Sequence, residues 1–392
     1  MDAPVAVLAA RRADILRHYR HPWVFSQGVL NTDRLREECT VQVKSEQGDH
    51  LGWAFYHPEN AICLRMITFD NAPMDAAAWK KRIADTLEMR RALLGSGVEG
   101  YRLIHGENDG FPGLKVDIYR DLIVAQLMCA GMEHLRPQMA QWLVEVTGCK
   151  AVYERSEGHA RKQEGLKPAQ GFIHEECPLP SRFKEDELEF MVDPSGPHKT
   201  AFYLDHRAQR RWLRARSHGK RVLDLCSYSG GFTLAALQGG ASFVHSIDTS
   251  AHYLGMLAEH LNINGLPADR QKSTRADIFD FLKGKPDERY DLVVLDMPSL
   301  ARSARAKPSA LRTYRKLHQA VSGWVRPGGI LVSFSCSKVV DRGDFRQSIF
   351  LGLRDCNREG LLIETFDSGP DHPIHLHFPE GEYLKGYAIY LK

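Results

Sequence analysis

The alternation of apolar and polar residues predicts strands in the first part of the chain. Residues 41–44, 51–56 and 61–66 alternate or run apolar, and turn-forming residues separate them. Short strands joined by tight turns are typical of a β-meander. We therefore expect a small β-rich domain over residues 1–72.

The next part of the chain mixes two periodicities. Apolar side chains recur at helical spacing in residues 75–93 and again in residues 132–147. Apolar runs at 121–126 and 151–155 are the length of strands. This mixture predicts a central α+β domain over residues 73–185.

Beyond residue 185, short apolar runs alternate regularly with helical patterns. The expected strands cover residues 221–225, 243–247, 291–295 and 329–334. The expected helices between them cover residues 232–238, 251–262 and 308–324. Such alternation is typical of a doubly wound parallel sheet. The fold class is thus α/β, with a Rossmann-like C-terminal domain over residues 186–392.

Composition narrows the class of protein. A chain of 392 residues with 43% hydrophobic residues is long enough for two or three cores. Its eight cysteines form no Cys-x-x-Cys pair and lack zinc-ligand spacing with histidine, so we expect reduced thiols, no metal site and a cytoplasmic location. Neither a basic signal-peptide start nor an apolar run of membrane-spanning length is present, so we expect no membrane partner.

A cofactor site is predicted where the strand at 221–225 turns into a helix. Ser227, Tyr228 and Gly230 lie in this turn, and the helix that follows presents free N–H groups. The turn lacks the G-x-G-x-x-G pattern of dinucleotide sites, so it suits a cofactor without phosphates, namely S-adenosylmethionine.

Two acidic residues farther along the chain complete the predicted cofactor site. Asp248 ends the next strand, where its carboxylate can accept both hydroxyls of a ribose, and Thr249 follows it. Asp277, with Ile278 beside it, is placed to bind an adenine amino group.

Cys336 and Asp296 are the candidate catalytic residues. Asp296 directly follows the expected strand 291–295, and Cys336 lies two residues after the expected strand 329–334. We expect these strands to be neighbours about 5 Å apart. A thiol beside a carboxylate at this edge can act as a nucleophile. A buried cysteine is also commonly a small apolar core residue, and Cys226 in the cofactor turn is a rival thiol.

A basic surface is predicted beside the candidate thiol. Residues 297–340 contain no acid, although the net charge of the whole chain is only +3. A solvated helix face explains such a run as readily as a phosphate-binding surface does. Its position beside the catalytic segments favours RNA binding, and the candidate contacts, including one near the N-terminus, are Arg302, Arg305, Lys307, Arg312, Lys316 and Arg20.

Several long motifs carry a resemblance to a known family. They are His21-Pro22-Trp23-Val24-Phe25-Ser26, the run 104–114, Lys199-Thr200-Ala201-Phe202-Tyr203-Leu204-Asp205-His206-Arg207, Ser335-Cys336-Ser337, Asp371-His372-Pro373 and the run 383–387. Nearly the whole chain resembles the bacterial 23S rRNA (cytosine-5) methyltransferases of the large-subunit methyltransferase I type. It departs from them at Met297 and His206, where proline and glutamine are usual.

The resemblance implies a PUA-like RNA-binding domain at the N-terminus and a class I methyltransferase domain at the C-terminus. It also implies a homodimer, 23S rRNA as substrate, and further cofactor contacts from Thr200, Phe202, Asp205, Arg207 and Pro298.

The function expected from these features is formation of 5-methylcytosine through a covalent adduct with Cys336. Asp296 would hydrogen-bond ring nitrogen 3, and His372 is a candidate for the base that removes the carbon 5 proton. Two alternatives stay open. One is guanine N-methylation, in which the thiol is passive; the other is a non-catalytic RNA-binding or ribosome assembly factor.

Overall fold

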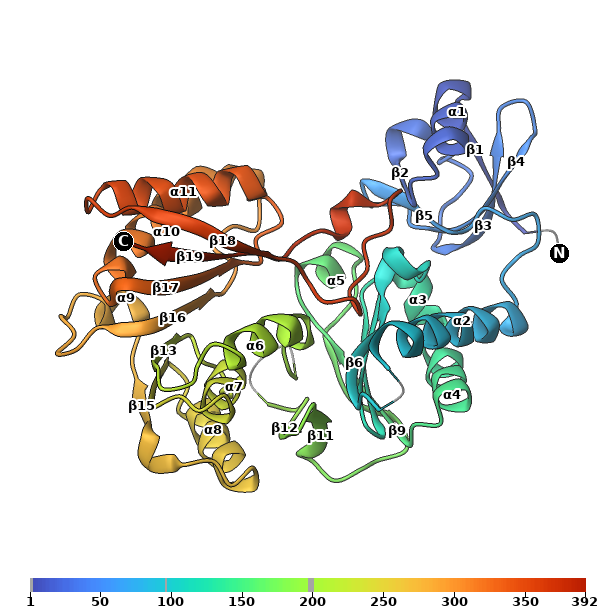
Figure 1. Cartoon of the computed structure of the whole chain (residues 1–392). Coiled ribbons are helices and arrows are strands. Elements are labelled where there is room, and N and C mark those ends of the chain that lie inside the picture. The colour runs from blue at the N-terminus through green and yellow to red at the C-terminus, as the bar shows by residue number, and fades with distance from the viewer. Residues whose placement is uncertain (1–2, 96, 197–200) are drawn as a thin grey trace. The chain divides into compact units, whose positions relative to one another are not determined.

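The computed structural model describes residues 3–95, 97–196 and 201–392. These residues form two compact units (Figure 1). The first unit comprises Met1–Glu185, Val192–Leu204 and Pro370–Gly381, and the second comprises Asp186–Met191, Asp205–Gly369 and Glu382–Lys392. The predicted boundaries at 72 and 185 stay predictions.

Two segments that lie within the predicted C-terminal domain group with the first unit. The guanidinium of Arg155 donates to the carbonyl oxygen of Pro194 in the segment Val192–Leu204. The backbone N–H of Arg102 donates to the Asp371 carboxylate, at 3.1 Å, in the segment Pro370–Gly381. Both segments are therefore held by hydrogen bonds to residues far earlier in the chain.

The N-terminal sheet contains the strands predicted from alternation. Its strand order is β1-β3-β4-β5-β2, and the elements are β1 (Val5–Leu8), α1 (Ala10–Tyr19), β2 (Trp23–Phe25), β3 (Cys39–Ser45), β4 (His50–Tyr56) and β5 (Ile62–Thr68). Leu8, Val41 and Leu64 are fully buried in its core. The antiparallel β3–β4–β5 meander confirms the strand prediction, whereas β1, β2 and α1 were not predicted.

A second five-stranded sheet follows, ordered β10-β9-β8-β7-β6. Its strands are β6 (Gly100–His105), β7 (Leu114–Tyr119), β8 (Leu122–Leu127), β9 (Ala151–Ser156) and β10 (Ala169–His174). The accompanying helices are α2 (Ala76–Leu94), α3 (Ala130–His134), α4 (Arg136–Thr147) and α5 (His159–Gln163). The helix predicted over 132–147 is two helices, because a proline stands in the first turn of α4, where its missing N–H costs nothing.

The second unit contains a seven-stranded sheet ordered β15-β14-β13-β16-β17-β19-β18. Its strands are β13 (Arg221–Leu225), β14 (Phe243–Asp248), β15 (Gln271–Arg275), β16 (Tyr290–Met297), β17 (Val325–Ser335), β18 (Gly360–Phe366) and β19 (Lys385–Leu391). The expected all-parallel sheet is corrected in one respect. β19 runs antiparallel to both of its neighbours, so the sheet is mixed.

Helices cover both faces of this sheet, as a doubly wound fold requires (Figure 1). α6 (Arg207–Arg214), α7 (Gly231–Gln238) and α8 (Ala251–Ile263) lie on one face. α10 (Lys307–Ser322) and α11 (Arg342–Arg354) lie on the other. The short helix α9 (Ile278–Phe281) follows β15, and two short strands, β11 (Ser181–Glu185) and β12 (Leu188–Val192), precede this domain.

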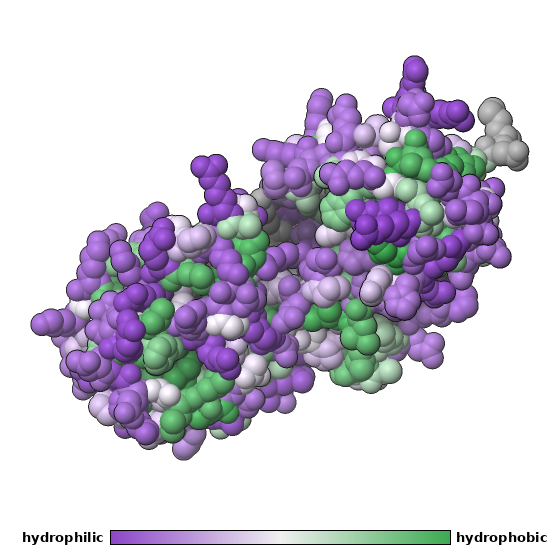
Figure 2. Space-filling model, turned by 90° about the horizontal axis from the view of Figure 1, so that it is seen from above, coloured by the Kyte–Doolittle hydropathy of each residue, from purple (hydrophilic) through white to green (hydrophobic). Residues whose placement is uncertain are grey.

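The surface is mostly hydrophilic on the face that Figure 2 shows, with apolar residues in separate patches. Within the part of the chain that the structure describes, no helix has both the length and the apolar character to cross a membrane.

Candidate active site

The cofactor turn joins β13 to α7 through an unusual backbone path. Cys226, Tyr228 and Gly230 all have positive φ angles, of 61°, 51° and 87°. Only glycine fits at position 230, since an added Cβ would lie 2.1 Å from the Cδ1 atom of Leu257. The turn therefore wraps tightly and starts α7 directly after Gly230.

Asp248 faces this turn from the end of β14. Its Oδ2 accepts a hydrogen bond from the Tyr228 N–H at 2.9 Å, and its Oδ1 accepts one from the Ser250 N–H at 2.8 Å. Two backbone donors thus fix the carboxylate, and each oxygen keeps a lone pair for another donor. Thr249 lies beside it and accepts from the Arg275 side chain through its carbonyl oxygen.

Asp277 lies close to Asp248 in the fold. The Ala276 N–H donates to the carbonyl oxygen of Asp248 at 3.0 Å, which brings the two segments together. Asp277 is exposed and caps α9 by accepting from the Phe279 N–H, whereas Ile278 is buried. The structure thus places four predicted cofactor residues, Tyr228, Gly230, Asp248 and Asp277, around one turn.

The polar groups of this turn fit S-adenosylmethionine. Among the described residues, the hydroxyls of Ser227 and Ser229 are buried without a hydrogen-bond partner, so they can bind a polar ligand. The pKa of the Cys226 thiol is raised by burial and then by the carboxylates of Asp296, Asp248, Asp224 and Asp277. Such a negative site favours a cationic sulfonium and disfavours the phosphates of a dinucleotide.

Asp224 adds to the negative character of the site and is itself fully buried. Burial raises its pKa to about 7, although the Thr233 hydroxyl donates to its Oδ2 at 2.7 Å. Positive charge bound nearby would favour its ionised form.

The predicted catalytic pair ends two neighbouring strands. β16 and β17 are parallel, and Asp296 is opposite Phe334 while Met297 is opposite Ser335. Cys336 directly follows this pairing, half-buried, with its Sγ 3.9 Å from the carbonyl oxygen of Met297. The expected neighbourhood of the two strand ends is therefore confirmed, while the catalytic roles stay predictions.

The thiol of Cys336 is neutral in the free protein. Burial, followed by the carboxylates of Asp296 and Asp205, raises its pKa to about 12. Asp205 is held by a hydrogen bond from the Tyr383 hydroxyl at 2.6 Å. A backbone hydrogen bond and the Lys385 side chain, on the neighbouring strand β19, oppose these effects only in part, so a reacting thiolate needs additional positive charge.

The two residues that depart from the resembled family both lie at this site. His206 places its Nε2 3.3 Å from Asp296 Oδ2. Met297 is buried, and its sulfur lies 3.8 Å from the Cys226 Sγ. Met297 therefore fills space between the cofactor turn and the end of β16.

Lys385 is a site residue that sequence reasoning missed. Its side chain is 3% exposed, and its Nζ donates to the carbonyl oxygen of Ser337 at 2.7 Å. Burial lowers its pKa to about 8. A lysine at the start of an otherwise apolar strand was the available signal, because lysine is seldom fully buried without a partner.

The remaining residues that we predicted to contact the cofactor do not belong to the cofactor turn. Arg207 is buried at the start of α6, and Pro298 is exposed directly after β16. Phe202 belongs to the first unit, where its ring meets Phe183 edge-on. Thr200 lies outside the described residues.

Most of the predicted RNA contacts are exposed. They are Arg302, Arg305, Arg312 and Lys316 in the second unit and Arg20 in the first. Lys307 departs from this group, because its ammonium is already paired with the carboxylates of Asp341 and Asp344. The guanidinium of Arg20 lies 5.6 Å from the centre of the Phe69 ring.

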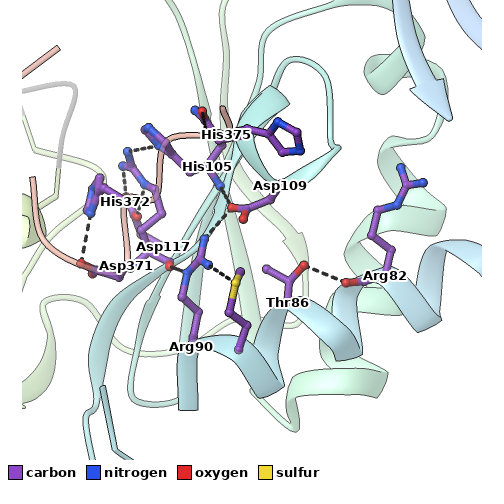
Figure 3. A network of polar contacts seen from close by, with 12 residues as sticks. Arg82, Thr86, Arg90, His105, Asp109, Asp117, Asp371, His372 and His375 are labelled. Carbon is purple, nitrogen blue, oxygen red and sulfur yellow. Dashed lines mark hydrogen bonds and ion pairs between the residues drawn. The ribbon is translucent and has the colours of Figure 1, made fainter. Parts of the chain in front are cut away.

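His372, the candidate base, lies in a buried network of the first unit (Figure 3). Its Nδ1 is 3.2 Å from Asp371, and its ring meets that of His105 at a centroid distance of 5.3 Å. Asp371 in turn accepts from the backbone of Arg102, whose guanidinium is bound by both oxygens of Asp117. This network anchors the segment Pro370–Gly381, and the role of His372 as a base stays a prediction.

Comparison with known proteins identifies related sequences over the full chain. Residues 102–347 match the model of an S-adenosylmethionine-dependent methyltransferase family, and residues 7–69 match that of a PUA-like domain. A Ribosomal RNA large subunit methyltransferase I from Photobacterium profundum is 36% identical, with 100% of both chains covered. The protein of that name from Klebsiella pneumoniae is 36% identical, with 98% of both covered.

A solved structure shares the fold. The chain superposes on the protein SMU.776, complexed with SAH, with a TM-score of 0.84, covering 99% of this chain and 100% of that one. At 20% identity, this likeness shows the architecture alone.

Proposed function

Because the chain belongs to the ribosomal RNA large subunit methyltransferase I family, whose members depend on S-adenosylmethionine, we propose that it forms 5-methylcytosine in 23S rRNA through a covalent adduct with Cys336. The observation that carries this proposal is the pairing of β16 with β17, which places Asp296 and Cys336 at one sheet edge near the cofactor turn. Guanine N-methylation remains the alternative enzymatic function, but the thiol of Cys336 does not take part in that reaction.

The thiol provides the nucleophile in this mechanism. Carbon 5 of cytosine is a poor nucleophile until Sγ of Cys336 adds to carbon 6. As the Sγ–C6 bond forms, the C5–C6 π electrons shift to form a C4–C5 double bond, and the C4–N3 π pair moves onto nitrogen 3. Cys336 is half-buried, and in this proposal its sulfur meets a base that has left its stack.

Asp296 provides a polar contact to nitrogen 3 of the cytosine. Its side chain is 22% exposed, so a carboxyl oxygen is accessible to the substrate. A proton shared between this oxygen and nitrogen 3 stabilises the electron pair that gathers there. The C4–C5 electron pair then bonds to the methyl group while the electron pair on nitrogen 3 restores the C4–N3 double bond. The reaction ends when water takes the proton on carbon 5, the C5–C6 double bond forms again and the sulfur leaves as thiolate with its electron pair.

The cofactor turn orients the methyl donor. S-adenosylmethionine, when bound, supplies an electrophilic methyl group on a sulfonium for carbon 5. The carboxylate of Asp248 is fixed by two backbone N–H groups and suits the ribose hydroxyls. Asp277 suits the adenine amino group, and the buried hydroxyls of Ser227 and Ser229 offer further polar contacts.

The exposed basic residues form the RNA-binding surface in this proposal. Replacing Arg302, Arg305, Arg312 and Lys316 by alanine together should weaken binding to an rRNA fragment at least roughly tenfold at low salt. The dependence of affinity on salt should also become shallower, by roughly 0.7 to 0.9 in log–log slope per lost phosphate contact. Fluorescence anisotropy over a salt series measures both quantities.

A second variant tests whether the loss of other surface charges has the same effect. Lys272→Ala with Lys285→Ala removes two exposed charges elsewhere in the same unit and should leave the slope unchanged. Equal salt-dependence slopes for the wild type and the fourfold variant would show that these four residues do not bind RNA phosphates.

The edge strand β18 is the proposed homodimer interface. Leu361, Leu362 and Ile363 are between 46% and 49% exposed, and a groove of about 710 Å³ lies between β18 and α11. Two copies of an edge strand can pair antiparallel about a two-fold axis. The groove also carries the exposed Arg346, whose charge complements Glu364 on the strand of a second copy.

Leu362→Glu should convert the dimer into a monomer, because the pairing would bring two buried carboxylates together. Light scattering after gel filtration gives the mass directly. Leu376→Glu, at a 95% exposed leucine outside the groove, is the control and should leave the mass unchanged. A wild-type mass of one chain at micromolar concentration would contradict the interface.

A further inference from the structure

The thiol that the proposed function requires is poorly placed to ionise unaided. The carboxylates of Asp296 and Asp205 both disfavour a negative charge on Cys336. Of these two carboxylates, Asp296 has the larger effect, so its charge has to be cancelled when the sulfur attacks. A residue in contact with Asp296 can do this.

His206 is in contact with Asp296. It directly precedes α6, its side chain is buried, and its Nε2 lies 3.3 Å from Asp296 Oδ2. Its ring is held edge-on between Phe334, at 4.7 Å, and Phe232, at 5.4 Å between ring centres. Packing against two aromatic rings fixes the direction in which Nε2 points.

The charges around His206 favour its protonated form. Burial and the nearby Arg210 lower its pKa, but Asp296 and Asp205 outweigh them, so the pKa is raised. Imidazolium therefore persists to a higher pH than in free histidine, and it is lost as the pH rises through that raised value. Its Nδ1 is buried and has no hydrogen-bond partner among the described residues, so the contact with Asp296 is its main polar interaction.

We propose that His206 is a positioning residue that holds a proton against Asp296 and so allows Cys336 to react. This inference rests on the proposed cytosine-5 chemistry and deepens it. The cationic ring cancels the field of the carboxylate, and the thiol proton leaves to water.

Over one turnover, each proton that moves can be followed to its acceptor. As the Sγ–C6 bond forms, the proton on Nε2 passes through Asp296 to nitrogen 3, leaving a neutral imidazole. When water has taken the carbon 5 proton and the sulfur leaves carbon 6 as thiolate, the proton on nitrogen 3 returns through Asp296 to Nε2, and the thiolate regains a proton from water. A histidine can carry this proton, whereas a glutamine at the same position can only donate a hydrogen bond.

The test compares the reactivity of Cys336 in the wild type and in His206→Gln, without RNA. Alkylation by iodoacetamide is followed by peptide mass spectrometry from pH 5.5 to 9.5, with Cys177 of the first unit as an internal reference. Thiolate is the reacting species, so each unit of pKa changes the rate about tenfold. The wild type should react roughly tenfold faster at low pH, and the ratio should fall to one at high pH, where His206 is neutral.

A double-mutant cycle separates charge from packing. In an Asp296→Asn background, His206→Gln should change the alkylation rate by less than twofold, because the carboxylate that His206 neutralises is gone. Calorimetric binding of S-adenosylhomocysteine confirms that each variant is folded. A ratio of rates that stays constant with pH, or an equal effect in both backgrounds, would overturn the inference.

The pH profile of single-turnover methylation separates this inference from the proposed function. His206→Gln should lose the high-pH fall in rate that deprotonation of His206 causes in the wild type. Absence of 5-methylcytosine from the wild-type reaction would refute the proposed function. Formation of 5-methylcytosine with the same pH profile in both proteins would refute only the role of His206.

Discussion

Replacing Cys336 by alanine should abolish methyl transfer to 23S rRNA and leave cofactor binding intact. The variant removes the only atom that can add to carbon 6 in the proposed mechanism, so we expect the rate to fall at least roughly 10⁴-fold. The cofactor turn lies on other strands, and its contacts with Asp248 do not involve this sulfur. Nucleoside mass spectrometry of rRNA incubated with labelled cofactor measures the loss.

The control for this variant is Cys356→Ala, another half-buried thiol of the second unit. It lies against Ser322, outside the cofactor turn and the β16–β17 edge, so 5-methylcytosine should still form. Retained 5-methylcytosine in Cys336→Ala would reject the nucleophile. Methylguanosine as the wild-type product would instead establish the rival chemistry.

A trapped adduct identifies the sulfur directly. RNA with 5-fluorocytosine at the target position cannot lose a proton from carbon 5, so the Sγ–C6 bond should persist. Intact-mass analysis should show one RNA bound per chain, and peptide mapping should place it on Cys336. An adduct on Cys226 would transfer the role to the thiol of the cofactor turn.

The parallel core of the second unit was predictable because its strands are buried on both faces. Val222, Leu223, Val293 and Val294 are all fully buried, and such strands read as continuous apolar runs. The same rule located the cofactor turn and the edge where Cys336 lies, since both follow from where such strands end.

The last strands of that sheet escaped prediction for the opposite reason. Most of β18 is exposed, so its apolar residues give no clear face, and β19 returns antiparallel after a short 3₁₀ helix, Pro379–Gly381, with no α-helix between the two strands. Lys385 was missed with β19. Its importance arises only from pairing with Ser335, fifty positions earlier in the chain.

The surroundings of His372 could not be predicted from its sequence motif. A histidine beside an aspartate suggests acid–base chemistry, but here both residues belong to a buried network with Arg102 and His105. The contact between Asp371 and Arg102 spans 269 positions. No local pattern records such a contact, so the buried network around His372 became visible only in three dimensions.

Asp248→Ala should weaken binding of S-adenosylhomocysteine between roughly tenfold and a hundredfold. A hydrogen bond to a charged group contributes about 1.5 to 3 kcal/mol, and each 1.4 kcal/mol is a tenfold change in Kd. The variant also frees the N–H groups of Tyr228 and Ser250, which now hold the carboxylate, so the turn itself loosens. Isothermal titration calorimetry measures both affinity and enthalpy.

Two comparisons make this result specific. Asp269→Ala removes an exposed carboxylate of the same unit and should leave Kd unchanged. Asp248→Asn keeps an oxygen for one of the two backbone donors, so its Kd should lie between those of the wild type and the alanine variant. An unchanged Kd for Asp248→Ala would remove the ribose contact from the end of β14, and the cofactor would then have to be held by Asp277 and the hydroxyls of the turn alone.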